Sequence, residues 1–437
     1  MELDVLVVNP WIYDFTAFNL WARPVGILKF LRLLQIHNIE FKYLDMMDYS
    51  SFLEEIPKEL GNIKTKSNGT SSYVREEVEK PVEYSNIKRH YYRFGLGRKF
   101  LFQELEDFSN IKFIVINSMM TYWYRSTIEI IDLLKERFPN SKIICGGIYP
   151  TLMKEHIKKN SRVDYLFPDQ KSGVEFICNK LFIKFNKNTE IDHFPLELYK
   201  INRFSPIYTS LGCPLNCPYC SSHIFYKNYN RRNIDKIVEE IQYYVSLGID
   251  KFAFYDDALL NNFENHLLKI SEIIMDRFNH IKFYTPNGLS ISQIDEKVAQ
   301  TLKKLNVQDI RLSLETSDKT FQKKIGKKAT IDQFERAIDY LTKAGFTNNQ
   351  IKVYLLAGLP EQSYNSVKNS IKFVNSFGIK SSLSEYSPVP GTLSFKRSLE
   401  QSPYPLLEEP LYHNRIILPI EGEINRENIN ELKKIIN

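Results

Sequence analysis

Short apolar runs alternate with amphipathic segments along the first 190 residues of the chain. Five of these runs have the length and apolar character of buried strands: residues 4–8, 40–44, 112–117, 142–145 and 163–167. Residues 25–34 and 127–138 instead place apolar side chains at helical spacing. Buried strands that alternate with helices indicate a parallel, doubly wound, Rossmann-like α/β sheet. A polar insertion at about 50–105 interrupts the pattern, and we expect it at the surface.

The same alternation continues from residue 191 to about 395, but here the predicted strands end in polar residues. The expected strands are 205–210, 251–255, 281–285, 309–315, 351–356 and 381–386, and the expected helices are 234–247, 264–278, 295–305, 331–344 and 364–377. Six strands with helices between them predict a partial, TIM-like (β/α)6 barrel, whose active site would lie at the carboxyl ends of the strands. We therefore expect one domain at 1–190, a barrel at 191–395 and a C-terminal extension at 396–437.

Composition and charge argue against several classes of protein. The 58 basic and 52 acidic residues give a net charge of +6 without a Lys/Arg block, so no nucleic-acid-binding module is evident. No apolar run reaches membrane-spanning length, and the acidic first residues lack the basic start of a signal peptide. We therefore expect a cytoplasmic protein. Of the five cysteines, Cys145 and Cys178 stand alone in apolar surroundings, as small core residues do.

The other three cysteines, Cys213, Cys217 and Cys220, lie in one short run, Gly-Cys-Pro-Leu-Asn-Cys-Pro-Tyr-Cys. Iron–sulfur clusters are usually held by four thiolates, so three from one loop would leave one iron with an open position. Open metal positions carry chemistry, whereas closed sites are structural. The alternative is a structural zinc loop in a non-catalytic scaffold. The sequence offers that loop only His223 nearby as a fourth ligand, and no second CxxC half.

Polar residues at strand ends give the barrel its candidate ligands. Asp256 and Asp257 directly follow one strand, although such pairs are also common in turns and helix caps. In the fourth strand, Arg311, Ser313 and Glu315 share one face because successive side chains alternate. Charged groups inside a barrel need a polar ligand or one another. A mutual pair of the Arg and the Glu is therefore the alternative to a bound ligand.

The cysteine spacing, the preceding Gly212 and the aromatic Tyr219 before the last cysteine resemble the radical S-adenosylmethionine (radical SAM) superfamily. The resemblance covers about residues 204–395 and implies a 4Fe–4S cluster whose free iron is chelated by S-adenosylmethionine. It implies that Asp256 or Asp257 binds the methionine amine of this cofactor. The further cofactor contacts that it implies are Tyr219, Asn287, Arg311, Ser313, Glu315 and Gly358. A turn is the alternative for Asn287, which lies in a Pro-Asn-Gly run.

The first half resembles uncharacterised radical SAM proteins that carry a cobalamin-binding-type domain before the barrel. The segments that carry this resemblance are 9–26, 118–124 and 146–151. Ser118, Gly146 and Gly147 fall at predicted strand ends, where ligands of open sheets bind. The Asp-x-His-x-x-Gly segment that ligates cobalt in some of these domains is missing after the first strand. We expect cobalamin bound without a protein ligand; the alternative is an empty domain used for dimerisation or substrate recognition.

Together, the resemblances imply an enzyme that cleaves S-adenosylmethionine reductively to a 5′-deoxyadenosyl radical, with a flavodoxin or ferredoxin as electron donor. With cobalamin bound, we expect methyl transfer to an unknown substrate; without it, a rearrangement, an oxidation or an epimerisation. Glu385 and Tyr386, at the end of the last predicted strand, are the candidate catalytic residues that would line the substrate space. A core aromatic is an equal alternative for Tyr386.

Overall fold

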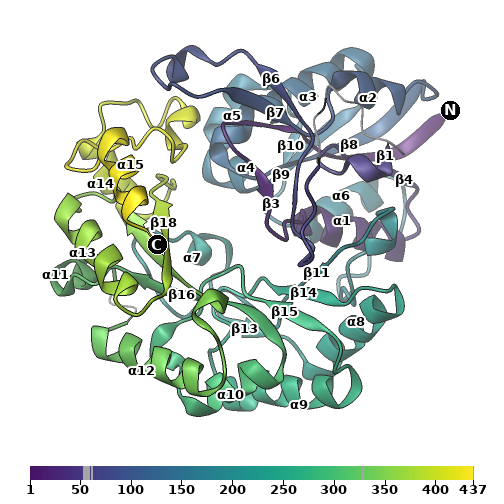
Figure 1. Ribbon diagram of the computed structural model, residues 1–437. Coiled ribbons are helices and arrows are strands. Elements are labelled where there is room, and N and C mark those ends of the chain that lie inside the picture. Colours follow the sequence, from purple (N-terminus) through teal and green to yellow (C-terminus); the bar gives the residue numbers. More distant parts are fainter. Residues whose placement is uncertain (53–59, 61–62, 327–328, 437) are drawn as a thin grey trace. The chain divides into compact units, whose positions relative to one another are not determined.

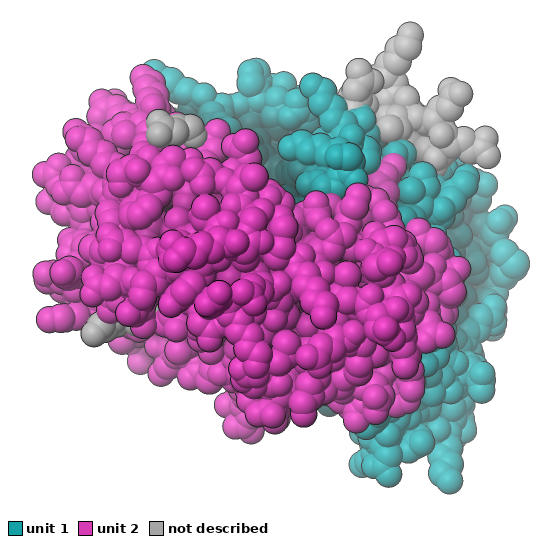
Figure 2. Space-filling model, turned by 60° about the horizontal axis from the view of Figure 1, so that its bottom comes forward, with its two compact units in different colours: residues 1–202, 407–411 teal, residues 203–406, 412–437 magenta. Residues whose placement is uncertain are grey.

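The structure is a computed structural model that describes residues 1–52, 60, 63–326 and 329–436. It divides into two compact units, which Figure 2 colours separately. Unit 1 comprises Met1–Asn202 and the short segment Leu407–Leu411, and unit 2 comprises Arg203–Leu406 and Tyr412–Asn437. The chain therefore leaves unit 2 for five residues before it returns to complete that unit.

Unit 1 is built on a five-stranded parallel sheet. Its strands are β1 (Glu2–Asn9), β4 (Phe41–Asp45), β8 (Asn110–Ser118), β9 (Lys142–Gly147) and β10 (Tyr165–Leu166). They lie in the order β10-β9-β8-β1-β4, and every neighbouring pair is parallel. The strand order reverses between β1 and β8, which defines the switch point of a doubly wound sheet. The predicted Rossmann-like fold is confirmed.

Helices cover both faces of this sheet, and α1 and α6 contact each other on one side (Figure 1). The helices of unit 1 are α1 (Val25–Ile36), α2 (Arg98–Gln103), α3 (Tyr124–Arg137), α4 (Ile148–Leu152), α5 (Lys154–Asn160) and α6 (Gln170–Lys180). In α1 the apolar residues recur every three or four positions, so one stripe from Val25 to Leu34 is buried against the sheet. Helix α3 packs on β8.

The described part of the polar insertion at about 50–105 folds onto the segment that follows β1. Short strands join the two regions: β2 (Ile12–Asp14), β3 (Phe18–Asn19), β5 (Ser71–Ser72), β6 (Arg75–Val78) and β7 (Tyr91–Phe94). They form an antiparallel sheet β2-β7-β6 and a pair β3-β5. The rings of Phe15, Tyr84 and Tyr91 pack within 5.0–5.5 Å of one another and provide a small core. Part of the insertion is thus buried, because its few aromatic residues outweigh its polar composition.

Unit 2 carries a six-stranded parallel sheet. The strands are β11 (Ser205–Ile207), β14 (Lys251–Phe254), β15 (Lys282–Tyr284), β16 (Val307–Glu315), β17 (Ile351–Ala357) and β18 (Lys380–Glu385), and they lie side by side in chain order. The helices between them are α8 (Ile234–Ser246), α9 (Leu267–Arg277), α10 (Glu296–Lys304), α12 (Ile331–Lys343) and α13 (Tyr364–Asn375). The predicted partial (β/α)6 architecture is confirmed.

Shorter strands and helices lie in the loops that follow these strands and in the C-terminal region. They are β12 (Ser210–Leu211), β13 (Asn230–Arg231), α7 (Ser222–Phe225), α11 (Lys319–Lys324), α14 (Leu393–Gln401) and α15 (Arg426–Ile435). The 3-10 turns are Tyr49–Ser51, Val82–Tyr84, Thr121–Trp123, Leu196–Leu198, Phe263–Asn265, Ile291–Gln293, Asn348–Gln350 and Pro410–His413. Helix α15 packs on α13. Within the described ranges, no helix has the length and apolar character needed to cross a membrane.

Candidate functional site

The three clustered cysteines lie on a loop that starts from β12, which pairs antiparallel with β13. Gly212 opens the loop with φ +79°, and a Cβ there would lie 2.7 Å from the carbonyl oxygen of Asn228, so only glycine fits. Cys217 is buried, with 5% of its surface exposed, and Cys213 and Cys220 are half-buried. None of the three forms a disulfide.

The residues that lead into this loop are held by Asp256, which directly follows β14. Its carboxylate accepts hydrogen bonds from the backbone N–H of Thr209 (3.0 and 3.1 Å) and of Ser210 (2.6 Å). The hydroxyls of the same two residues donate to it at 2.7 and 2.6 Å. Asp256 is 3% exposed, and this burial raises its pKa although the hydrogen bonds act in the opposite direction. The carboxylate therefore anchors the entry of the cysteine loop.

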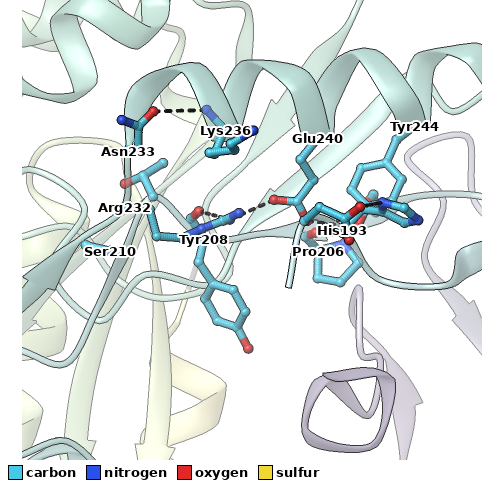
Figure 3. A network of polar contacts seen from close by, with 12 residues as sticks. His193, Pro206, Tyr208, Ser210, Arg232, Asn233, Lys236, Glu240 and Tyr244 are labelled. Atoms are coloured by element: carbon cyan, nitrogen blue, oxygen red, sulfur yellow. Dashed lines mark hydrogen bonds and ion pairs between the residues drawn. The ribbon is translucent and has the colours of Figure 1, made fainter. Parts of the chain in front are cut away.

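A second network fixes the same segment from the side of α8 (Figure 3). The Arg232 guanidinium donates to the carbonyl of Tyr208 at 2.8 Å and to the buried carboxylate of Glu240 at 2.7 Å. The Tyr244 hydroxyl donates to the other oxygen of Glu240 at 2.8 Å. The carbonyl of Thr209 accepts from the Arg232 backbone N–H at 2.9 Å. The loop thus starts from a rigid base.

The donor chemistry of the loop fits an iron–sulfur cluster better than a closed zinc site. Three thiols come from one short turn, in which the Cys220 N–H donates to the Cys217 carbonyl at 3.0 Å. His223, the only nearby fourth ligand for zinc, is exposed on α7. Within the described ranges, no group of three or more Cys, His, Asp and Glu side chains is arranged so that it could hold a metal ion. The fit therefore rests on the three sulfur donors of the loop and not on a ready-made coordination geometry.

The two neighbouring aspartates have different surroundings. Asp256 is engaged by Thr209 and Ser210, whereas Asp257 is exposed and accepts a hydrogen bond from the Ser222 hydroxyl at 2.5 Å. Asn287 donates from its side-chain nitrogen to the carbonyls of Tyr255 (3.1 Å) and Asp256 (3.2 Å), so it ties β14 to the end of β15. Of the two aspartates, Asp257 has the carboxylate more open to an ammonium group. Its contact with the cofactor stays a prediction.

On β16, Arg311 has partners that the sequence did not predict. The buried Arg311 guanidinium pairs with Asp309, at 2.8 Å, and its other nitrogen donates to the Tyr354 hydroxyl at 2.5 Å. Asp309, two residues earlier, lies on the same face of the strand, so it neutralises the buried guanidinium. Ser313 is buried, and its hydroxyl points at Gly288, where a Cβ would lie only 2.0 Å away.

Glu315 ends β16 in a conformation that simple alternation does not predict. The register between β16 and β17 shifts between Ser313 and Glu315, and Glu315 has φ +68°. Glu315, at this bulge, is an electrostatic neighbour of Tyr219. Burial raises the pKa of Tyr219 above its ordinary range, and the neighbouring Glu315 and Cys217 raise it further. The strand end and the cysteine loop therefore meet at Tyr219.

The end of β17 is a tight turn. Gly358 has φ +89°, and a Cβ there would lie 3.0 Å from the side chain of Leu418. The Gln362 side chain closes the turn by accepting from the N–H groups of Gly358 (2.9 Å) and Leu359 (3.2 Å). The backbone at Gly358 is thus held in a fixed shape, as an adenine contact would require, and that contact stays a prediction.

The two candidate catalytic residues have structural partners. Glu385 pairs with Arg426 at 3.1 Å and with Lys433, both on α15. Burial by itself would raise the pKa of Glu385, but these two cations lower it below its ordinary value. Tyr386 lies in an apolar cluster, where its hydroxyl contacts Ser398 at 3.0 Å and burial raises its pKa to about 12. These contacts attach the C-terminal segment and favour the core alternative for Tyr386. A role of either residue toward a substrate stays a prediction.

In unit 1, a mainly apolar pocket opens at the carboxyl ends of β8 and β9. Its walls include Phe30, Val115, Ile144, Phe167 and the glycines Gly26, Gly146, Gly147 and Gly173. A Cβ at Gly146 would meet no atom within 4 Å, whereas Gly147 has φ +110° and a Cβ there would lie 2.2 Å from the Ser118 carbonyl. The Ser118 hydroxyl bonds that of Thr127 at 2.8 Å. The walls of this pocket are thus largely apolar and rich in glycine.

A buried polar network lies at the switch point of the same sheet and was not predicted from the sequence. Asn9 donates to Asp45 at 2.7 Å and accepts from Asn117 at 3.1 Å. The Tyr199 hydroxyl donates to Asp45 at 2.8 Å, and the Arg23 guanidinium lies 3.8 Å above the Tyr199 ring. The available signal was that Asn9, Asp45 and Asn117 all stand at the ends of parallel strands.

Comparison with known proteins finds one family model that matches a segment within unit 2. Residues 207–374 match the model of the Radical SAM superfamily. The chain is 26% identical over 206 residues to an uncharacterized methyltransferase of Pyrococcus horikoshii, covering 46% of this chain and 44% of that protein. It is 22% identical over 246 residues to cytidylyl-2-hydroxyethylphosphonate methyltransferase of Streptomyces wedmorensis, covering 53% of this chain and 44% of that protein. The chain thus spans less than half the length of these curated relatives.

Two solved structures share the fold. One is the radical S-adenosylmethionine methyltransferase TsrM from Kitasatospora setae with cobalamin and a [4Fe-4S] cluster bound; the TM-score is 0.69 at 14% identity, covering 100% of this chain and 91% of that one. The other is the cobalamin-dependent enzyme OxsB with aqua-cobalamin and S-adenosylmethionine bound, with a TM-score of 0.56 at 13% identity, covering 91% and 55%. Residues 207–374 therefore match the Radical SAM superfamily model, and the chain as a whole shares the fold of these two structures.

Proposed function

We propose that this chain is a radical SAM enzyme whose 4Fe–4S cluster is held by Cys213, Cys217 and Cys220. The observation that carries the proposal is the position of this thiol triplet, on a braced loop at the carboxyl ends of a six-stranded parallel sheet. When bound, the cluster and S-adenosylmethionine supply a one-electron cleavage that yields methionine and a 5′-deoxyadenosyl radical. The protein supplies the orientation of the cofactor and the exclusion of water.

The strand ends provide the groups that would hold the cofactor. Asp257 offers an exposed carboxylate to the methionine ammonium, which is a charge-assisted contact. Glu315 and Ser313, both buried at the end of β16, offer hydrogen-bond acceptors to ribose hydroxyls. The turn at Gly358, which Gln362 holds in a fixed shape, would present its backbone to the flat adenine.

We further propose that unit 1 binds cobalamin and that the reaction is a methyl transfer. The glycine-lined apolar pocket at the ends of β8 and β9 supports this, since it lies where a doubly wound sheet binds its ligands. The names of the two relatives above, both methyltransferases, also favour it. Cobalt would be bound without the ligating histidine segment, which this sequence lacks. The chemical class of the methyl acceptor stays open.

Anaerobic reconstitution with iron and sulfide tests the cluster. The wild type should bind iron and sulfide, absorb broadly in the visible range and release 5′-deoxyadenosine with a strong reductant. Cys217→Ala should lose both cluster and product, because it removes one of three ligands. Cys178→Ala is the matched control, since Cys178 is buried on α6 of unit 1 and should change neither. A wild-type chain that binds only zinc would overturn the proposal.

The pocket test uses Gly146, where a new side chain meets no protein atom within 4 Å. Gly146→Leu should fill the pocket and weaken cobalamin binding at least tenfold, whereas Gly146→Ala should bind almost normally. Both variants should keep the cluster, because it belongs to unit 2. Equal cobalamin affinity in Gly146→Leu and the wild type would remove the pocket from the proposed site.

The remaining partners follow from the same chemistry. A radical SAM enzyme needs a reductant and a substrate, and we propose a flavodoxin or ferredoxin as the electron donor. We also propose a cytoplasmic location, because three neighbouring thiols with no disulfide suit a reducing compartment. Reduction of the reconstituted cluster by a purified flavodoxin system, compared with dithionite, checks the donor.

A further inference from the structure

Asn117, near the end of β8, is a polar residue in the wall of the pocket of unit 1. It is 9% exposed, and a Cβ on Gly147 would lie 3.0 Å from its side-chain oxygen, Oδ1. That oxygen therefore lies beside the glycine pair that borders the pocket. A polar group in a mainly apolar wall selects ligands by the hydrogen bond that it can make. The direction of the Asn117 amide thus decides which ligands the pocket favours.

The direction of this amide is set two residues away, at the buried carboxylate of Asp45. One oxygen of Asp45 accepts from the Asn9 side-chain nitrogen at 2.7 Å and from the Met47 N–H at 3.1 Å. The other oxygen accepts from the hydroxyls of Tyr43 at 3.1 Å and Tyr199 at 2.8 Å. A carboxylate has no hydrogen to give, so Asn9 must turn its NH2 group toward it.

The same direction passes from Asn9 to Asn117. Because the Asn9 nitrogen faces Asp45, its oxygen is left to accept from the Asn117 side-chain nitrogen, at 3.1 Å. An amide carries its oxygen and its nitrogen on different sides of one carbon, so the Asn117 oxygen turns away from Asn9. Among the described residues, no donor bonds that oxygen. The two asparagines thus form a relay that starts at a carboxylate and ends with an acceptor at the pocket.

The other polar groups of the wall lack this combination of fixed direction and available acceptor. The Asp169 carboxylate is used at the N-terminus of α6, where it accepts from the N–H of Ser172 at 2.9 Å and from its hydroxyl at 2.8 Å. Gln170 is half-buried, and in the described part of the chain no hydrogen bond fixes its amide. Gln170 can therefore offer either its oxygen or its nitrogen, whereas Asn117 offers only an oxygen.

A fixed acceptor favours a ligand that brings an N–H group to this point. It disfavours a carboxylate there, because two facing acceptors leave both without a hydrogen. We propose that Asn117 is a specificity-determining residue of this pocket, that it accepts a hydrogen bond from a primary amide of the ligand, and that Asp45 fixes its direction through Asn9. The inference rests on the proposed function, since it takes cobalamin, whose corrin ring carries primary amides, as the ligand.

The test measures equilibrium binding of cyanocobalamin to the full chain, followed by ultrafiltration and absorbance. It also uses each monocarboxylic acid of cyanocobalamin in which one primary amide has become a carboxylic acid. The wild type should bind one of these acids at least tenfold more weakly than the parent. Asn117→Leu should bind that acid and the parent within about threefold of each other, because the acceptor is gone. A wild type without such a preference, or an Asn117→Leu variant that keeps it, would overturn the proposal.

Asn110→Leu is the matched control, because Asn110 starts the same strand at its opposite end. This variant should keep both the affinity for cyanocobalamin and the preference for the amide. A loss of preference in Asn110→Leu equal to that in Asn117→Leu would show that any such change in β8 abolishes the preference, and it would contradict the role of Asn117.

Two further variants test the relay. Asn9→Leu removes the oxygen that holds the Asn117 nitrogen, so the amide can turn and the preference should shrink. In Asp45→Asn the Met47 N–H cannot rotate, so the new amide must keep its oxygen on the side of Met47 and Asn9. The hydroxyls of Tyr43 and Tyr199 can rotate to accept from the new NH2 group, and the preference should persist. An unchanged preference in Asn9→Leu, or its loss in Asp45→Asn, would contradict the relay.

These outcomes separate the inference from the function on which it rests. A wild type that binds no cyanocobalamin sinks the proposed site in unit 1 itself. A wild type that binds the parent and all the acids alike keeps that site and overturns only the role of Asn117. Circular dichroism and thermal unfolding are measured first in every variant. If Asn117→Leu does not fold, the wild-type preference and Asn9→Leu still decide the proposal.

Discussion

Asp256 provides the sharpest test of how the cysteine loop is held. Asp256→Ala removes the acceptor for the N–H groups of Thr209 and Ser210, and neither N–H can rotate toward another partner. An unsatisfied buried donor costs about 1–3 kcal/mol, so the two together should lower the free energy of unfolding by about 2–6 kcal/mol. The two hydroxyls can rotate, and we expect them to add little.

Asp256→Asn keeps a hydrogen-bond acceptor oxygen at this position but removes the negative charge of the carboxylate. Four of the five hydrogen bonds end on one carboxylate oxygen, and the Thr209 N–H reaches both oxygens. An asparagine oxygen in that place keeps these donors satisfied, so the loss should stay within about 1 kcal/mol. Urea unfolding of the reconstituted chain, followed by circular dichroism and by iron release, measures both variants.

The same residue predicts a pH dependence. Because burial raises the pKa of Asp256 in the folded chain, the folded state holds this proton more tightly than the unfolded state does. Its contribution to stability is therefore full below the ordinary value of 3.8 and is lost as the pH rises through the raised pKa. Asparagine does not titrate, so the wild type should lose stability relative to Asp256→Asn across that interval. The reasoning would be refuted if Asp256→Ala were as stable as the wild type. It would also be refuted if Asp256→Asn and Asp256→Ala had the same free energy of unfolding.

Two further substitutions test other parts of the fold. Gly147→Ala should destabilise unit 1 by more than 1 kcal/mol, because φ is +110° and the new Cβ would clash with the Ser118 carbonyl; thermal unfolding against Gly146→Ala, where no clash exists, checks this. Glu385→Gln should loosen α15, since it removes the partner of Arg426 and Lys433. The lowered pKa of Glu385 means that its contribution holds above 4.5 and is lost as the pH falls through the folded pKa. Limited proteolysis near residue 426 at two pH values measures it, and equal cleavage of variant and wild type would contradict it.

Local pattern carried much of the fold, because parallel strands buried on both faces are apolar runs that read directly from the sequence. Pairings that join distant segments were not readable in this way. The pairing of Arg311 with Asp309 was not predicted, although both residues lie on the same face of one strand, and the bulge between Ser313 and Glu315 was not predicted either. The partners of Glu385 lie 41 and 48 residues further along the chain, on a helix whose docking no local signal predicts.

The candidate site shows the same division. The cysteine triplet was visible because its three cysteines fall within eight residues, and its interpretation follows from the resemblance of this run to the radical SAM superfamily. The choice between Asp256 and Asp257 was not visible, since it depends on which side chain the Thr209 and Ser210 donors engage. Likewise, the electrostatic interaction of Tyr219 with Glu315 joins residues far apart in the sequence, and Glu315 has a positive φ that a glutamate rarely adopts.

The five-residue return of the chain to unit 1 bears on how the protein is made. Tyr84 donates to the Leu411 carbonyl at 2.8 Å, and Tyr124 bonds the Glu409 carboxylate at 3.1 Å. Both acceptors leave the ribosome some two hundred residues after the rest of unit 1. Domains generally fold in order of synthesis. Unit 1, however, can form its contacts with Leu407–Leu411 only after nearly the whole barrel has been translated. A gene fragment that stops at residue 202 therefore encodes an unfinished unit.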